Sequence, residues 1–128
     1  NHFSTLINIQ LCASVSRKKA IETMSGGDYL LIFAKPNKER YMPGKLFDYA
    51  ASGTPILAYG YEGEITSCIN EGKLGVFCPE GDYKKLTSIL LNDETSYFDD
   101  YFEQRHTWLK NKTREYQAKA FFNLLNNV

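Results

Sequence analysis

The sequence lacks an excess of charge of either sign. Fifteen lysine and arginine residues balance fifteen aspartate and glutamate residues, so the formal net charge at pH 7 is zero. Domains that bind nucleic acids through the phosphate backbone concentrate basic residues on one face and are commonly basic overall. The even balance of charge therefore disfavours nucleic acid as a partner.

Long hydrophobic runs are also missing. No stretch of the sequence approaches the roughly 18 consecutive apolar residues of a membrane-spanning helix. Residues Asn1–Thr5 lack the basic start and the small-residue cleavage site of a secretory signal peptide. These absences predict a cytoplasmic protein without a membrane span.

Cysteine and histidine are scarce and scattered. Cys12, Cys68 and Cys78 are odd in number and have apolar neighbours. That pattern predicts buried, reduced thiols rather than a disulfide framework or a zinc site. His2 and His106 lie far apart in the sequence, so no histidine pair stands at metal-ligand spacing. We therefore expect no metal ion.

The chain does have enough apolar material for a core. Hydrophobic residues make up 43% and aromatic residues 14% of its 128 residues. Chains that stay disordered lack this apolar content, and the length is typical of one domain. Residues 1–128 are therefore predicted to form a single domain.

Short apolar runs alternate with segments of helical periodicity. The runs of strand length are Leu6–Leu11, Tyr29–Phe33, Pro55–Tyr59 and Leu74–Phe77. Helices are predicted from the N-cap Ser16 to about Met24, from Pro43 to Ser52-Gly53, at Glu64–Asn70 and from Asp82 to about Leu91. Residues 96–128 are predicted to be a helical tail, with helices at Tyr97–Arg105 and Thr107–Asn126. The side chains expected to hold this tail to the domain are Trp108, Tyr116, Phe121 and Phe122.

This alternation indicates the fold class. Strands that are apolar on both faces are typical of a parallel sheet covered by helices, and strand–helix–strand units form right-handed crossovers. We expect a Rossmann-like, three-layer α/β/α fold with about four parallel strands. Because ligands bind beyond the carboxyl ends of such strands, the loops after Phe33 and after Tyr59 are the candidate binding surfaces.

The helix predicted after Phe33 begins with residues suited to a phosphate. Pro43 fits the first helical position, which needs no amide hydrogen, and Gly44 allows close approach to the backbone. The free amides of the first turn attract an anion, and Lys45 adds a full positive charge. Asp48 lies one turn further along the same face and, as an ionised acceptor, suits the hydroxyls of a ribose. Together these residues predict a site for a nucleoside diphosphate.

The same residues also fit an ordinary amphipathic helix. Lys45 and Asp48 then form only a weak surface pair, while the opposite face packs onto the sheet through Leu46, Phe47, Ala50 and Ala51. The loop Gly60–Glu64 leaves a similar choice. Its glycines either present amides to a ligand or serve only the turn, with Glu64 complementing the helix dipole.

Residues 41–57, with the sequence YMPGKLFDYAASGTPIL, resemble a donor-binding signature. It is found in the C-terminal domain of GT-B fold glycosyltransferases of the group 1 or family 4 type, retaining enzymes of bacterial cell-surface polysaccharide synthesis. The resemblance extends from about Leu6 to Gly81 and includes, in order, Gly27-Asp28, Gly60-Tyr-Glu-Gly-Glu-Ile, Gly72-Lys-Leu-Gly and Gly81-Asp82. Several separated motifs in the right order are more specific than any one alone.

The resemblance implies a domain that binds a nucleotide-diphosphate sugar, either a UDP-sugar or a GDP-sugar, without a cofactor or metal ion. The full-length glycosyltransferase would transfer the sugar to a polysaccharide or glycolipid acceptor, in the cytoplasm at the inner face of the membrane, which it would contact peripherally. The implied binding residues are Arg40, Tyr41, Gly44, Lys45, Asp48, Gly63 and Glu64.

Two positions depart from the family pattern. Asp48, the implied ribose ligand, stands where glutamate is more usual, and Arg40 stands where related enzymes carry an acidic residue near the transferred sugar. The phosphate-binding units and the N-terminal acceptor-binding domain of the family are expected upstream of this chain. The catalytic residues are therefore not identified, and the chain alone is expected to be inactive.

Two other functions stay open. A nucleotide-sugar epimerase shares the GT-B architecture but needs a general acid and base at the domain cleft. The other alternative is a non-catalytic α/β module that binds nucleotides or regulates a partner. A receiver-like module of this kind is disfavoured, because Leu6–Leu11 is followed by Cys12-Ala13 rather than by an acidic cluster.

Overall fold

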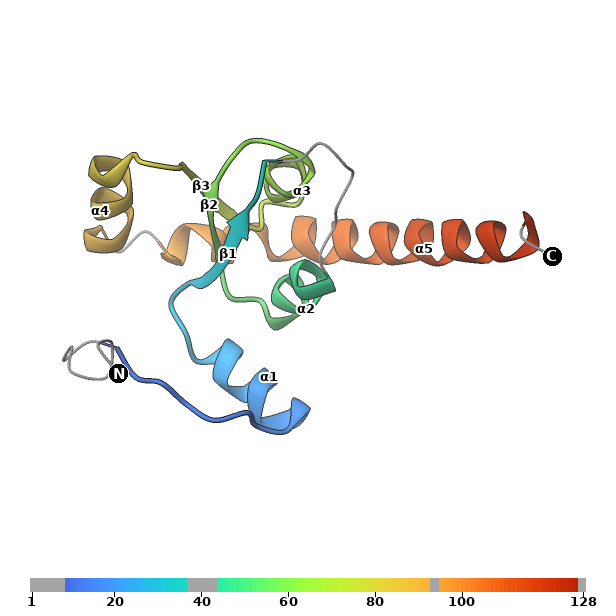
Figure 1. Ribbon diagram of the computed structural model, residues 1–128, viewed down its shortest axis with the longest axis horizontal. Coiled ribbons are helices and arrows are strands. Elements are labelled where there is room, and N and C mark those ends of the chain that lie inside the picture. The colour runs from blue at the N-terminus through green and yellow to red at the C-terminus, as the bar shows by residue number, and fades with distance from the viewer. Residues whose placement is uncertain (1–8, 37–43, 93–94, 127–128) are drawn as a thin grey trace.

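The computed structural model describes residues 9–36, 44–92 and 95–126 of the chain. Along the sequence helices and strands alternate from α1 to α4, and two further helices follow, as Figure 1 shows. The elements are α1 (Arg17–Ser25), β1 (Leu30–Ala34), α2 (Gly44–Ser52), β2 (Ile56–Gly60), α3 (Glu64–Gly72), β3 (Gly75–Pro79), α4 (Tyr83–Leu91), the 3₁₀ helix η2 (Thr95–Tyr101) and α5 (Phe102–Asn126).

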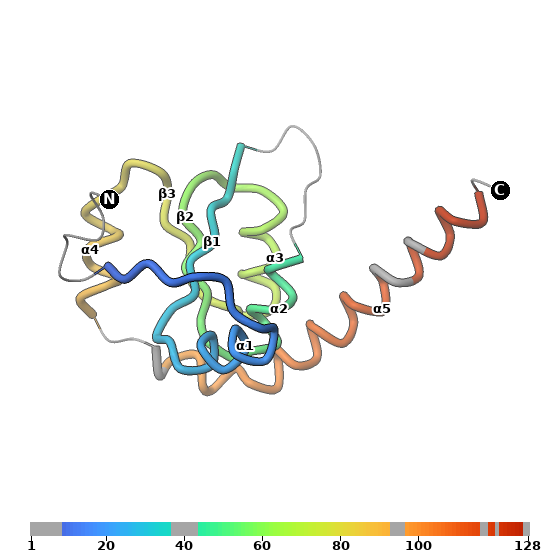
Figure 2. Tube along the Cα trace, turned by 60° about the horizontal axis from the view of Figure 1, so that its bottom comes forward, coloured from blue at the N-terminus to red at the C-terminus, as the bar shows by residue number. Residues whose placement is uncertain are grey.

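The three strands form a parallel sheet in the order β1-β2-β3. The register places Ile32 beside Ala58 and Ala58 beside Phe77. Helices α2 and α3 lie on one side of the sheet and α4 on the other, in both Figure 1 and Figure 2. The architecture is therefore α/β with a parallel sheet, compatible with the expected Rossmann-like fold.

The core lies between the sheet and the helices α2, α3 and α5. Its fully buried side chains include Leu46 from α2, Ile56 from β2 and Ile69 from α3. Helix α5 closes this core with Trp108, whose ring stacks on Phe47 at a centroid distance of 6.1 Å. The prediction that Trp108 holds the C-terminal helix to the domain is thus confirmed.

The buried face of α2 is rotated about the helix axis relative to the prediction. Leu46 and Ala50 are buried and Phe47 is half-buried, as expected, but Ala51 is exposed. Tyr49 is half-buried in its place and packs against the core. The helix is therefore turned so that position 49, and not position 51, borders the buried stripe.

Within the described residues the sheet has three strands, against the expected four or so. The missing one was predicted at Leu6–Leu11, of which residues 6–8 lie outside the described part. Residues 9–11 form no strand, and Ile9 and Leu11 are exposed. Cys12 beside them is exposed as well, which corrects the prediction that all three cysteines are buried, whereas Cys68 and Cys78 are buried as predicted.

The C-terminal tail is one long helix rather than two. The 3₁₀ helix η2 ends at Tyr101, and α5 then runs without a break for 25 residues. No glycine or proline occurs between Phe102 and Asn126 to interrupt it. No helix in the described part of the chain is long and apolar enough to span a membrane.

The outer half of α5 also corrects a prediction. It continues past α2 and α3 and projects from the body, as Figures 1 and 2 show. Phe121 and Phe122 are 62% and 65% exposed there, so they do not hold the helix to the domain. The side chain of Tyr116 lies outside the described residues.

Two predicted helix starts are confirmed by their caps. The Ser16 hydroxyl accepts a hydrogen bond from the Lys19 amide at 3.2 Å at the start of α1. The Asp82 carboxylate accepts one from the Lys85 amide at 3.0 Å at the start of α4. Each side chain satisfies a first-turn amide that has no partner within its helix.

Candidate functional site

The carboxyl ends of β1 and β2 lie side by side. Ala34 and Gly60, the last residues of the two strands, are register partners. The amide of Tyr61 donates a hydrogen bond to the carbonyl of Ala34 at 2.8 Å, so the pairing continues past the end of β2. The loops that precede α2 and α3 therefore leave the sheet from adjacent points, at the edge where ligands of parallel α/β sheets bind.

Gly60 is required for this close approach. Its φ is +140°, and a Cβ atom built there would lie 2.2 Å from the carbonyl oxygen of Ala34. That separation is far inside van der Waals contact, so a side chain would push the two strand ends apart. Glycine at position 60 thus allows the two candidate binding loops to start next to each other.

Aromatic side chains surround the same edge. Phe33 is 65% exposed and meets the ring of Tyr59 edge-to-face at 6.5 Å. The Tyr59 hydroxyl accepts a hydrogen bond from the Gly81 amide at 2.9 Å, which ties the edge to the turn after β3. The Tyr61 hydroxyl donates to the Glu80 carboxylate, and this hydrogen bond raises the pKa of Tyr61.

The first turn of α2 is open to solvent. Gly44 and Lys45 are exposed, and a Cβ atom built at Gly44 would meet nothing within 4 Å. Residues 37–43 lie outside the described part, and with them the predicted contacts Arg40 and Tyr41 and the predicted first helical residue Pro43. The described part of this turn therefore leaves space for an anion beside Lys45.

Asp48 has a partner that the sequence analysis did not predict. Its carboxylate lies 3.6 Å from the guanidinium group of Arg17 at the start of α1. The Asp48 side chain is 51% exposed and the Arg17 side chain 81%, so the pair lies on the surface. Exposed pairs of this kind contribute roughly 0–1 kcal/mol, which a ligand that hydrogen-bonds Asp48 can replace.

The first turn of α3 is closed by hydrogen bonds between the main chain of Gly63 and two hydroxyl side chains. The amide of Gly63 donates to the Thr66 hydroxyl at 2.9 Å, and the hydroxyls of Thr66 and Ser67 donate back to the Gly63 carbonyl at 2.8 and 3.1 Å. Gly63 has an extended backbone with φ 171°. Its role in the turn is therefore local, because these hydrogen bonds occupy both of its main-chain polar groups.

Glu64 faces a groove between α2, α3 and α5. It is half-buried, in agreement with its predicted place at a helix N-terminus. The groove has a volume of about 360 Å³ and is lined by Phe47, Glu64, Ser67, Cys68, Glu71, Lys112, Glu115 and Lys119. Helix α2, which carries Gly44, Lys45 and Asp48, thus borders the same groove as α3. Its contribution to the groove lining is Phe47.

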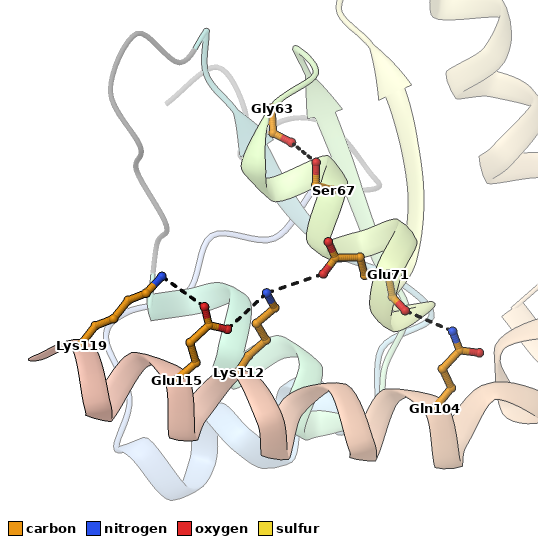
Figure 3. Close-up of polar contacts among 7 residues, drawn as sticks. All are labelled: Gly63, Ser67, Glu71, Gln104, Lys112, Glu115 and Lys119. Carbon is orange, nitrogen blue, oxygen red and sulfur yellow. Dashed lines mark hydrogen bonds and ion pairs between the residues drawn. The ribbon is translucent and has the colours of Figure 1, made fainter.

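Ion pairs connect four of the side chains that line this groove, as Figure 3 shows. Lys112 on α5 lies 3.7 Å from Glu71 on α3 and 3.6 Å from Glu115, and Lys119 lies 3.2 Å from Glu115. Partial burial lowers the pKa of Lys112, but the two glutamates outweigh it and raise the pKa on balance. The hydrogen bond from Lys119, together with Lys112, lowers the pKa of Glu115.

The sequence analysis missed this α3–α5 contact. The one feature of the sequence that indicates this contact is the spacing of residues 112, 115 and 119, which places them on one helix face. The spacing does not indicate which neighbouring helix they contact. Within the described part of the chain, no group of three or more His, Cys, Asp or Glu side chains could hold a metal ion.

The residues predicted for the diphosphate and the ribose, Gly44, Lys45 and Asp48, thus all lie on α2, while Gly63 and Glu64 lie at the start of α3. Both helices follow the carboxyl edge of the sheet. A scan against models of known protein families finds no match to this chain. Searches of curated proteins and of solved structures also find none.

Proposed function

We propose that this chain is the donor-binding part of a GT-B glycosyltransferase, and that it binds a nucleotide-diphosphate sugar. The observation that carries the proposal is the pairing of Ala34 with Gly60, which brings the starts of two βα loops together. One loop leads to Gly44 and Lys45, and the other to Gly63 and Glu64. First-turn amides of a helix and a lysine beside them suit a diphosphate.

In this proposal Lys45 and the first-turn amides of α2 neutralise charge that develops on the leaving diphosphate. Electrostatic stabilisation of this kind is the main catalytic requirement when the leaving group is anionic. Asp48 accepts hydrogen bonds from the ribose hydroxyls after Arg17 has moved away. No metal ion takes part. Arg40 and Tyr41 complete the contacts from the loop before α2.

The remaining parts of the proposed enzyme lie outside the described residues. A further strand, upstream of β1 and outside the described residues, extends the sheet to four strands or more. An upstream acceptor-binding domain supplies the catalytic groups and the second half of the cleft. The whole enzyme acts in the cytoplasm on a polysaccharide or glycolipid acceptor.

Calorimetric titration of the 128-residue chain with UDP and with GDP tests the proposal. We expect weak binding of one nucleotide, and loss of that binding in Asp48→Ala. Arg17→Ala removes the competing ion pair without touching the proposed ligand contacts. Because that pair contributes at most about 1 kcal/mol, Arg17→Ala should raise the affinity by up to about fivefold.

Glu22→Ala is the matched control, because Glu22 is an exposed acidic residue on α1 that the proposal does not use. It should bind nucleotide like the wild type. Equal affinities of the wild type and Asp48→Ala would contradict the ribose assignment. Failure of both UDP and GDP to bind the wild type would contradict the proposal as a whole.

A further inference from the structure

The outer half of α5 carries an apolar surface that meets nothing else in the described part of the chain. Four large apolar side chains within five residues are 57–68% exposed, namely Phe121, Phe122, Leu124 and Leu125. Figure 2 shows that this end of the helix points away from the sheet and from all other helices. Single exposed apolar residues are common on protein surfaces, but a cluster of four at one tip indicates an interaction site.

The two sides of α5 have different chemistry. The side that faces the body carries Arg105 and Trp108, which are buried, and Lys112, which pairs with Glu71 on α3. Glu115 and Lys119 continue this side at helical spacing and pair with each other. The ionic groups of this side are therefore already satisfied within the molecule.

The opposite side carries basic residues followed by apolar ones. Residues three or four positions apart lie on the same face of a helix. This spacing places five residues on one face, namely Lys110, Arg114, Ala118, Phe121 and Leu125. All five are exposed. No acidic residue stands at these positions, and Glu115, the one acidic residue between 107 and 126, lies on the other side. From Lys110 onward, this face of α5 is thus basic first, at Lys110 and Arg114, and apolar at the tip; Glu103, nearer the body on the same face, precedes it.

We propose that this face of α5 binds the surface of an anionic lipid membrane. Helices that lie in the interface of a bilayer place apolar side chains at the boundary of the acyl chains and basic side chains among the headgroups. In this arrangement Phe121, Phe122 and Leu125 lie at the boundary of the acyl chains. Lys110 and Arg114 lie among the headgroups. The contact is peripheral, and it does not depend on the nucleotide site proposed above.

The charge of the face favours a membrane over a second copy of this chain. Two copies that packed in parallel along this face would bring two basic surfaces together, and two antiparallel copies would set the basic half of each helix against the apolar tip of the other; both arrangements are unfavourable. An anionic bilayer offers the opposite charge over the whole length of the face, and each basic residue near it adds to the attraction. A helix pair would also leave Phe122 and Leu124, which flank the face, partly in water.

Co-sedimentation of the full chain with lipid vesicles, in the absence of nucleotide, tests this proposal. Vesicles of phosphatidylcholine with phosphatidylglycerol should bind the chain, and vesicles of phosphatidylcholine alone should bind it much more weakly. The double variant Phe121→Ser/Phe122→Ser should lower the vesicle affinity by about a hundredfold, because it removes two large apolar groups from the contact. Lys110→Glu/Arg114→Glu should lower the affinity for anionic vesicles by about tenfold or more.

Leu90→Ser/Leu91→Ser on α4 is the matched control, because both leucines are exposed apolar residues outside the proposed surface. This variant should bind vesicles like the wild type, and circular dichroism should show that every variant is folded. Equal vesicle binding by the wild type and Phe121→Ser/Phe122→Ser would overturn the proposal. Concentration-dependent dimers in sedimentation equilibrium, lost in the same variant and without any vesicle binding, would assign the face to a second copy instead.

Discussion

Arg105 on α5 donates a hydrogen bond from Nη1 to the main-chain carbonyl of Gly53, the residue after α2, at 2.6 Å. Arg105 is only 5% exposed. Burial lowers the pKa of its guanidinium group, and nearby Asp99 acts in the opposite direction. A buried cation that satisfies the last turn of another helix ties two elements 52 positions apart in the sequence.

Arg105→Ala should lower the free energy of unfolding by about 2–4 kcal/mol. The substitution removes a charge-assisted hydrogen bond and leaves the Gly53 carbonyl without this donor. Urea denaturation followed by circular dichroism measures the change. Arg114→Ala is the control, because Arg114 is exposed on the same helix and its loss should change the stability by less than about 0.5 kcal/mol. Equal stability of the two variants would show that the Arg105 contact is unimportant.

Gly72→Ala should lower the free energy of unfolding by about 1–3 kcal/mol. A Cβ atom at position 72 would lie 2.9 Å from side-chain atoms of both Leu74 and Trp108, so the core must shift to admit it. Gly44→Ala offers a control at a helical glycine with open space around it, where the change should be small. Thermal unfolding of both variants checks this, and a loss of stability confined to Gly44→Ala would contradict the packing described for Trp108.

Gly60→Ala should cost about 3 kcal/mol or more, because the new side chain would overlap the Ala34 carbonyl and force β1 away from β2. Gly81→Ala separates this clash from backbone strain, since Gly81 has a φ of +83° but nothing within 4 Å of a Cβ atom. It should cost only about 1–2 kcal/mol. Urea denaturation of the pair measures the difference, and similar losses in both would mean that strain alone requires glycine at position 60.

The stability of the fold should depend on the ionisation of Cys68 in alkaline solution. Burial, with a smaller contribution from Glu71, raises the pKa of the Cys68 thiol from 9.0 to about 11. Between these two pH values the unfolded chain releases a proton that the folded chain retains. The free energy of unfolding should therefore be unaffected by this thiol below pH 9 and fall as the pH rises toward 11.

Cys68→Ala isolates the contribution of this thiol from those of all other groups. Its free energy of unfolding should fall less steeply with pH than that of the wild type between pH 9 and pH 11. Urea titrations at several pH values give both slopes. Parallel slopes would show that Cys68 ionises equally easily in the folded and unfolded chains.

Local chemistry was sufficient to predict most of the elements. Ser16 was predicted to be a helix cap and Asp82 to begin a helix, and each side chain accepts a hydrogen bond from a first-turn amide. The runs Tyr29–Phe33, Pro55–Tyr59 and Leu74–Phe77 were recognised as parallel strands from their continuous apolar character, and β1, β2 and β3 lie there within one or two residues. These features depend on neighbours in the sequence, which a single sequence contains. Burial on both faces was wrong for β1, in which Leu31 and Phe33 are exposed.

The candidate site was predicted only in part, because it depends on residues that are distant in the sequence. The sequence places Lys45 and Asp48 on one helix face, and the structure agrees, but the Arg17 partner of Asp48 arrives from another helix. Whether these residues bind a nucleotide stays a prediction. The groove beside Glu64 likewise needs Lys112 and Glu115 from a helix about fifty positions away in the chain, and no local pattern encodes that meeting.

Phe121 and Trp108 illustrate the division between sequence and tertiary structure. The sequence by itself determined that both belong to a helix, because propensity and the lack of glycine or proline act through neighbouring residues. Only the tertiary structure decided that Trp108 is buried against Phe47 while Phe121 stands in solvent. Burial depends on where the rest of the molecule ends, and the body ends before the outer half of α5 begins.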